Sequence, residues 1–245
     1  MTQPIIAIFK ALADEHRLEL FSILLSSDRT NSELVEETGL SQNLLSHHLS
    51  VLSEAGLIRV QQSIGDARRR YYSVNLETVC LMSDWWRRST PVCEVPLPPL
   101  RRPRRILFLC MRNAARSLMA EAIARHIAAG AIIPSSAGLE ASAEITPLMI
   151  TVLDEKGVPS TGLNPQTYDR LVHEPFDGLI TVCDRVHEHG LPPELAHIPC
   201  VHWSLHDPLE EADTEAGQLA AMRRLYTEIE RRLVLFVQRL AAEES

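Results

Sequence analysis

The sequence predicts a two-domain protein. Its first domain is a mostly helical winged helix-turn-helix with a β-hairpin wing, and its second is an α/β domain with a parallel four-stranded sheet. Helical periodicity followed by a short hairpin fills residues 1–88, whereas strands alternate with helices over residues 105–245. Residues 89–104 between them hold five prolines and suit an extended linker. A long surface loop within one domain is the alternative.

Composition narrows the class of protein. The chain has 245 residues, a formal net charge of −8 and 45% hydrophobic residues, which suit a globular protein. The negative charge excludes a general nucleic-acid coat, so any DNA binding needs a local basic patch. No run of eighteen apolar residues and no signal peptide is found, and five scattered cysteines predict free thiols. We therefore expect a cytoplasmic protein with no membrane partner.

The first domain follows a helix-turn-helix pattern. Apolar spacing predicts helices over 5–13, 17–25, 32–38 and 42–55, a hairpin over 57–74 and a last helix over 76–86. Ser41 is a good N-cap for the fourth helix, and Gly56 suits its C-terminal end. This fourth helix is the expected recognition helix in the major groove.

The residues expected to contact DNA fall into two groups. The start of the recognition helix would face base edges with Gln42, Asn43, Leu44, Ser46 and His47. The hairpin tip would contact phosphates with Arg68, Arg69 and Arg70. A small helical protein-interaction domain with a solvated charge run is the alternative.

At this point the sequence resembles the ArsR family of winged-helix repressors. The resemblance spans about residues 4–90 and is carried by LADEHRLELFSILL, SELVEETGLSQNLLSHHLSVLSEAGLIRV and RRRYYSV. It implies a homodimer, formed through the first and last helices, that binds an inverted-repeat operator. The Cys-x-Cys metalloid site of many members is missing, as is the carboxylate–histidine site of others. Cys80 and Cys93 remain weak candidate ligands for a soft metalloid, and no metal site is assigned.

The second domain alternates strands and helices. Strands are expected over 106–110, 131–138, 178–184 and 197–204, and helices over 117–129, 146–156 and 214–242. Such alternation is typical of a parallel sheet with helical crossovers.

The motif CMRNAARS lies between the first of these strands and the helix that follows it. Backbone amides of a loop entering a helix form an anion nest, and Arg116 can hold a tetrahedral oxyanion with two hydrogen bonds. The same field favours the thiolate of Cys110, the expected nucleophile. The expected oxyanion loop comprises Met111, Arg112, Asn113, Ala114, Ala115, Arg116 and Ser117. A buried strand-end cysteine followed by a surface arginine is the alternative.

Attack on an oxyanion also needs an acid for the leaving oxygen. Asp207 in HWSLHDP follows the last expected strand, and Pro208 stiffens its loop. We expect Asp207 to be this acid, and the alternative is an ordinary turn residue before proline.

These residues carry a second resemblance, over residues 104–242. ILFLCMRNAARSLMAEAIARH, SSAGLE, GLITVCD and HWSLHDP are similar to the low-molecular-weight protein tyrosine phosphatase family, and most to its thioredoxin-coupled arsenate reductase branch. The resemblance implies that Cys110, Arg116, Ser117 and Asp207 are catalytic, and that Cys183 is a resolving thiol. It also implies arsenate or phosphate as the bound oxyanion. No cofactor is bound, and thioredoxin, glutaredoxin with glutathione, or mycothiol supplies the reducing thiols.

The sequence departs from the branch at several points. Gly190 stands where the reductase branch has a third cysteine. Cys200 or an external thiol would then have to complete the catalytic cycle in its place. Leu209 replaces the aromatic residue that phosphatases place after Asp-Pro, and Arg112 replaces the loop's usual glycine.

Three functions fit these observations. The leading one is an arsenic-resistance protein that joins a transcriptional regulator to an arsenate reductase. The others are a protein tyrosine phosphatase-like enzyme with a DNA-targeting domain, and a non-catalytic regulator that senses an oxyanion. Leu209 and Cys183 favour the first over the second, and the set of Cys110, Arg116 and Asp207 opposes the third.

Overall fold

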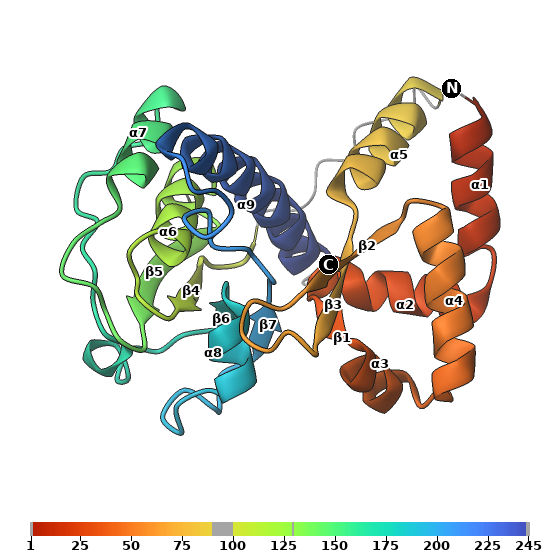
Figure 1. Ribbon diagram of the computed structural model, residues 1–245, viewed down its shortest axis with the longest axis horizontal. Coiled ribbons are helices and arrows are strands. Elements are labelled where there is room, and N and C mark those ends of the chain that lie inside the picture. Colours follow the sequence, from red (N-terminus) through yellow and green to blue (C-terminus); the bar gives the residue numbers. More distant parts are fainter. Residues whose placement is uncertain (1, 90–99, 129, 244–245) are drawn as a thin grey trace. The chain divides into compact units, whose positions relative to one another are not determined.

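The chain forms two compact units, residues 1–96 and 97–245, in a computed structural model that describes residues 2–89, 100–128 and 130–243 (Figure 1). Most of the predicted linker, residues 90–99 with Cys93, lies outside the described residues. The first strand of the second unit begins at Arg104, the last residue of that predicted linker.

The N-terminal unit is a winged helix-turn-helix. Its elements are α1 (Thr2–Leu12), α2 (Glu15–Ser26), β1 (Arg29–Thr30), α3 (Asn31–Thr38), α4 (Gln42–Glu54), β2 (Ile58–Gln62), β3 (Arg70–Val74) and α5 (Leu76–Ser89). The antiparallel sheet has the order β1-β3-β2, and the loop between β2 and β3 is the wing. β1 is missing from the predicted elements because a strand of two residues leaves no periodic pattern.

Local signals explain the placement of α3 and α4. Thr30 and Glu33 form a capping box at the start of α3, and Gly39 ends it with φ of 69°, a conformation that favours glycine. The Ser41 side chain accepts from the backbone N–H of Leu44 at the start of α4. Leu45 and Leu52 are buried, as the helical spacing predicts, so the opposite face of α4 is left to solvent.

The C-terminal unit is a four-stranded parallel sheet with helices packed on it. Its elements are β4 (Arg104–Cys110), α6 (Arg116–Ile127), β5 (Ile132–Gly138), α7 (Pro147–Glu155), η1 (Tyr168–Arg170), β6 (Gly178–Thr181), α8 (Asp184–His189), β7 (Cys200–His202) and α9 (Glu215–Glu243). α6 packs on β4 and β5 and against α9, while α8 contacts β4 and β6. Both predicted fold classes are confirmed.

The strand order β5-β4-β6-β7 determines where a ligand can bind. The chain moves from β4 to β5 on one side and then crosses to β6 on the other. Loops leaving β4 and β6 therefore diverge at their carboxyl ends, which is where open α/β sheets form binding crevices. Cys110 is the last residue of β4, and Cys183 follows β6 by two residues.

Two predicted strands are wrong in extent. The fourth parallel strand was expected over 197–204, but β7 covers only Cys200–His202. The third parallel strand was expected to run to Asp184, but β6 ends at Thr181, and Asp184 begins the unpredicted helix α8. The signals for α8 are present in the sequence: an acidic first residue, histidines in the last turn and Gly190 with φ of 87° at the end. Cys183 is therefore the N-cap residue of a short helix and not a strand residue.

Candidate active site and DNA-binding surface

The loop from Cys110 to Arg116 folds closely around the Cys110 sulfur. The backbone N–H of Asn113 donates to Cys110 Sγ at 3.1 Å, and Ser117 Oγ lies 2.9 Å from the same sulfur. Asn113 has φ of 48°, a left-handed conformation that asparagine adopts more readily than most residues. The loop thus presents hydrogen-bond donors to the sulfur from its backbone and from the first turn of α6.

The Asn113 amide sets the direction of these hydrogen bonds. Its Oδ1 accepts from the backbone N–H of Gln166 at 2.8 Å, so its Nδ2 group donates to Ser117 Oγ at 2.9 Å and to Ser136 Oγ at 2.8 Å. Because Ser117 Oγ accepts from Asn113, its own proton is available to Cys110 Sγ. Two hydrogen-bond donors therefore converge on the one sulfur.

Glu121 lies beneath this network. Ser136 Oγ donates to Glu121 Oε2 at 2.6 Å, and Arg125 pairs with the same carboxylate. Burial raises the pKa of Glu121 above its ordinary value, although the bonds from Ser136 and Arg125 act in the opposite direction. Neither Ser136 nor Glu121 was singled out in the sequence, because their contacts connect β5 with α6 and follow no local spacing.

Gly138 permits the loop to lie against β5. A Cβ atom at this position would lie 2.8 Å from the carbonyl oxygen of Met111 and 3.0 Å from the backbone of Arg112 and Asn113. Real Cβ atoms essentially never approach backbone this closely, so only glycine fits. The segment SSAG contains the signal for this approach, a glycine at the end of a predicted strand.

Arg116 joins the loop to the expected acid. Its guanidinium donates to Asp207 Oδ2 at 2.8 Å and to the carbonyl of Leu205 at 2.9 Å. Burial acts to lower the pKa of Arg116, but the pKa is raised overall because Cys183, Asp207 and Cys110 interact with the charge. Arg116 therefore stays cationic at the centre of these groups.

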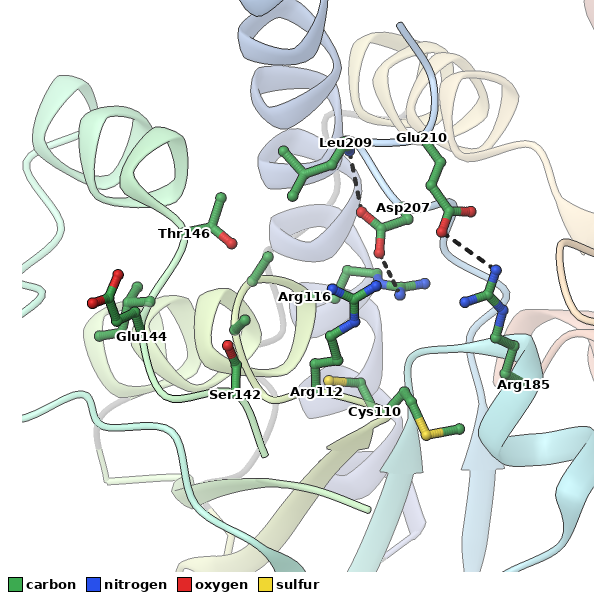
Figure 2. A pocket seen from close by; sticks show the side chains of 14 residues that line it. Cys110, Arg112, Arg116, Ser142, Glu144, Thr146, Arg185, Asp207, Leu209 and Glu210 are labelled. Carbon is green, nitrogen blue, oxygen red and sulfur yellow. Dashed lines mark hydrogen bonds and ion pairs between the residues drawn. The ribbon is translucent and has the colours of Figure 1, made fainter. Parts of the chain in front are cut away.

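A pocket of about 230 Å³ opens above the loop (Figure 2). Of the predicted oxyanion residues, Asn113 and Ser117 are buried. The others line the pocket together with Cys110: Met111, Arg112, Ala114, Ala115 and Arg116. Asp207 and Leu209 line it as well, and the wall carries an ion pair of 3.3 Å between Arg185 and Glu210. Arg112, Arg116 and Arg185 supply the positive charge that suits a compact anion, and they offset three carboxylates in the same lining.

Cys183 and Cys200 differ in burial. Cys183 is 2% exposed and interacts electrostatically with Arg116, although it does not line the pocket. Cys200 is exposed and pairs in register with Leu179, which pairs with Leu107. That places Cys200 three residues back from Cys110 and two strands away, or about 10 Å in each direction. A disulfide requires Cα atoms within about 7 Å, so this fold excludes a direct Cys110–Cys200 bond.

The N-terminal unit exposes the residues expected to contact DNA. Gln42, Asn43, Leu44, Ser46 and His47 all lie on the solvent face of α4. Arg68 and Arg69 are exposed on the wing, and Arg70 is the first residue of β3. Asp66 was missed as a neighbour: it accepts from Arg68 at 3.0 and 3.1 Å and lies 3.7 Å from Arg69.

Cys80 is an exposed thiol on α5. Within the part of the chain that the structure describes, no three His, Cys, Asp or Glu side chains are placed to hold a metal ion. No helix among the described residues is long and apolar enough to cross a membrane.

The fold and the cysteine loop together define an α/β domain with a small pocket at the carboxyl end of β4, lined by Cys110 and Arg116. Residues 105–245 match the family of the low molecular weight phosphotyrosine protein phosphatases, and residues 14–60 match the bacterial regulatory protein arsR family. The first match covers more than half of the chain, so the chain belongs to the low molecular weight phosphotyrosine protein phosphatase family. The predicted fusion of an ArsR-type helix-turn-helix with this domain is confirmed.

Individual relatives match one unit each. The glutaredoxin arsenate reductase of Synechocystis sp. is 32% identical over 121 residues, which are 47% of this chain and 90% of that protein. The probable mercury resistance operon repressor of Streptomyces lividans is 41% identical over 66 residues, 27% of this chain and 50% of that protein. A solved arsenate reductase in the phosphate-binding state is 29% identical with a TM-score of 0.48, covering 58% of this chain and 99% of that one.

Proposed function

We propose that the C-terminal unit reduces arsenate to arsenite and that the N-terminal unit regulates transcription by binding an operator. The observation that carries the first part is the arrangement around Arg116, which donates to Asp207 at 2.8 Å and lines one pocket with Asp207 and Cys110. The relative named glutaredoxin arsenate reductase, matched over 90% of its length, supports the choice of substrate.

The first step uses the residues that line the pocket. The Cys110 thiolate attacks arsenic while Arg116 and the loop amides hold the oxygens, and Asp207 delivers a proton so that one oxygen leaves as water. The product of this step carries a sulfur–arsenic bond. Leu209 at the pocket wall offers no flat aromatic surface for a phosphotyrosine ring, which favours a small inorganic oxyanion.

The second step uses Cys183. Its sulfur attacks the Cys110 sulfur, a disulfide forms, and the sulfur–arsenic electron pair stays on arsenic, so As(V) becomes As(III). The Cys183 proton ends on an oxygen of the departing arsenite. An external thiol reductant (thioredoxin, glutaredoxin with glutathione, or mycothiol) then reduces the Cys110–Cys183 disulfide, and no bound cofactor takes part.

The N-terminal unit acts as a homodimer on an inverted-repeat operator. α1 and α5 carry large apolar side chains that are exposed in the single chain, among them Ile6, Phe9, Leu81 and Trp86. Pairing of these helices between two copies would bury the surface and place two α4 helices for two half-sites. We locate the protein in the cytoplasm, where operator DNA and thiol reductants occur together.

The test is a turnover assay of the full chain. Arsenate is supplied with each of the three thiol systems in turn, and p-nitrophenyl phosphate is assayed beside it. Arsenite production that needs one of the thiol systems supports the proposal. Hydrolysis of the phosphate ester without arsenite production would assign a phosphatase instead. If neither activity is found, the C-terminal unit would be assigned as an oxyanion sensor.

A further inference from the structure

A buried histidine clamps the helix that begins beside Cys183. His202 is the last residue of β7, and its side chain is fully buried. Its Nδ1 lies 2.8 Å from Thr181 Oγ1 on β6, and its Nε2 lies 3.3 Å from Asp184 Oδ1 on α8. The imidazole of His187 stacks on the same ring with centroids 4.2 Å apart and planes 8° from parallel. One ring thus contacts β6 and two residues of α8.

Both contacts fall on one face of α8. Asp184 and His187 are three residues apart, so they stand one above the other on the helix surface. α8 has only six residues, too few to hold its own conformation without tertiary contacts. The His202 ring therefore fixes both turns of α8 against the end of the sheet.

This clamp determines where the Cys183 sulfur lies. Before Cys183, the backbone N–H of Val182 donates to the carbonyl of Leu109 at 2.9 Å, and Leu109 directly precedes Cys110. After Cys183, the Asp184 carboxylate lies 3.3 Å from His202 Nε2, within ion-pair distance although outside hydrogen-bond geometry. The backbone of Cys183 is thus fixed on both sides, once to the strand that ends in Cys110 and once to β7.

We propose that His202 is a positioning residue for Cys183 and acts through Asp184. This inference rests on the proposed function, in which the Cys183 sulfur must reach the Cys110 sulfur. Disulfide formation tolerates little error in the separation of the two backbones. Removal of the Asp184 interaction frees the first turn of α8 and moves Cys183 out of line, while Cys110, Arg116 and Asp207 stay in place.

A matched pair of variants separates the Asp184 interaction from the rest of the histidine. In His202→Gln the amide extends to about the position of Nε2 and can still contact Asp184. In His202→Asn the amide reaches only the position of Nδ1, so it can still bond to Thr181 but no longer reaches Asp184. His187→Phe, which keeps a flat ring on His202, is the control for stacking.

The full-length variants are compared by the rate of Cys110–Cys183 disulfide formation, measured by mass spectrometry after arsenate is added to the reduced protein. We expect His202→Asn to slow this rate by about tenfold or more, since small misplacements of reacting groups carry large rate penalties. The rate of disulfide formation in His202→Gln and in His187→Phe should stay within about threefold of the wild-type rate, because Cys183 keeps its position in both. Hydrolysis of p-nitrophenyl phosphate, which needs only the Cys110 step, should be the same in all four proteins.

A parallel arm uses diamide, a two-electron thiol oxidant, in place of arsenate. A wild-type disulfide that forms with diamide but not with arsenate would refute arsenate reduction, and the variants would still test the role of His202. Equal rates for His202→Asn and His202→Gln with both oxidants would overturn the inference. A fall in phosphatase activity that parallels the fall in disulfide formation in His202→Asn would also overturn it. So would the absence of a Cys110–Cys183 disulfide in the wild type with either oxidant.

Discussion

The guanidinium of Arg116 donates a 2.8 Å hydrogen bond to the carboxylate of Asp207. The residue that would hold the oxyanion is therefore bonded directly to the residue that would protonate the leaving oxygen. An oxyanion that takes this N–H group must displace the carboxylate. Asp207 lines the pocket, so we expect binding of the substrate and placement of the acid to be coupled.

Asp207→Asn tests this coupling. The amide oxygen can still accept from Arg116, but the side chain delivers no acidic proton. We expect kcat for arsenate, and for p-nitrophenyl phosphate, to fall by about 100-fold, within the usual range for loss of a general acid. Glu211→Gln is a suitable control, because Glu211 pairs with Arg224 and does not line the pocket. Wild-type turnover by Asp207→Asn would remove Asp207 from the mechanism.

Cys110→Ser tests the nucleophile. A serine hydroxyl occupies nearly the same volume, and it is not ionised at neutral pH. The hydrogen bonds from Asn113 and Ser117 then act on a neutral oxygen. We expect arsenate reduction to be lost while thermal unfolding and DNA binding remain as in the wild type. Retained turnover by this variant would be incompatible with a cysteine nucleophile.

Most of the helices and strands, and the cysteine loop, could be predicted from sequence because their signals are local. The spacing of Leu45 and Leu52, the cap at Ser41 and the strand–loop–helix context of Cys110 each lie within one segment. Local patterns could not identify Glu121, Ser136 and His202. The role of each depends on a contact with a different helix or strand, which the sequence does not show. The end of β6 was misjudged since the apolar run GLITVC continues past Thr181, and the start signal at Asp184 was outweighed.

Glu121 should make the stability of the protein depend on pH. Its pKa in the folded chain is raised by burial, so the folded state holds its proton more tightly than the unfolded chain does. The stabilisation from this group is complete below its unfolded pKa of about 4.3 and is lost as the pH rises through the raised folded pKa. Glu121→Gln has no such proton to lose.

The measurement is the free energy of unfolding of the wild type and Glu121→Gln between about pH 4 and pH 8, a range that starts near the unfolded pKa. All other groups are shared, so the difference between the two proteins isolates Glu121. We expect the wild type to lose stability relative to the variant as the pH rises. If the wild type instead gains free energy of unfolding relative to Glu121→Gln as the pH rises, the raised pKa of Glu121 is contradicted.

The wing arginines and the α4 residues should affect DNA binding differently. Replacing Arg68, Arg69 and Arg70 with alanine should weaken binding to operator and random DNA alike. It should also flatten the salt dependence by about one unit for each phosphate that an arginine no longer neutralises. Asp66→Asn, which removes the charge that pairs with Arg68 and Arg69, should strengthen binding to both DNAs. Fluorescence anisotropy over a salt series measures these changes.

Gln42→Ala and Asn43→Ala should instead alter sequence preference, because exposed amides at the start of α4 would contact base edges. The expected result is weaker binding to the operator with little change on random DNA. Equal weakening on both DNAs would show that α4 is not the recognition helix.

The second thiol tests the account most directly, since a phosphatase needs one cysteine and an intramolecular reductase needs two. Reduced wild-type protein is mixed with arsenate for a single turnover, and the disulfides are mapped by mass spectrometry beside arsenite release. We expect one arsenite for each Cys110–Cys183 disulfide. Cys183→Ser should release none with thioredoxin as reductant, while keeping any phosphatase activity. Full arsenate reduction by Cys183→Ser, with glutathione or mycothiol as the only thiol, would contradict the intramolecular route.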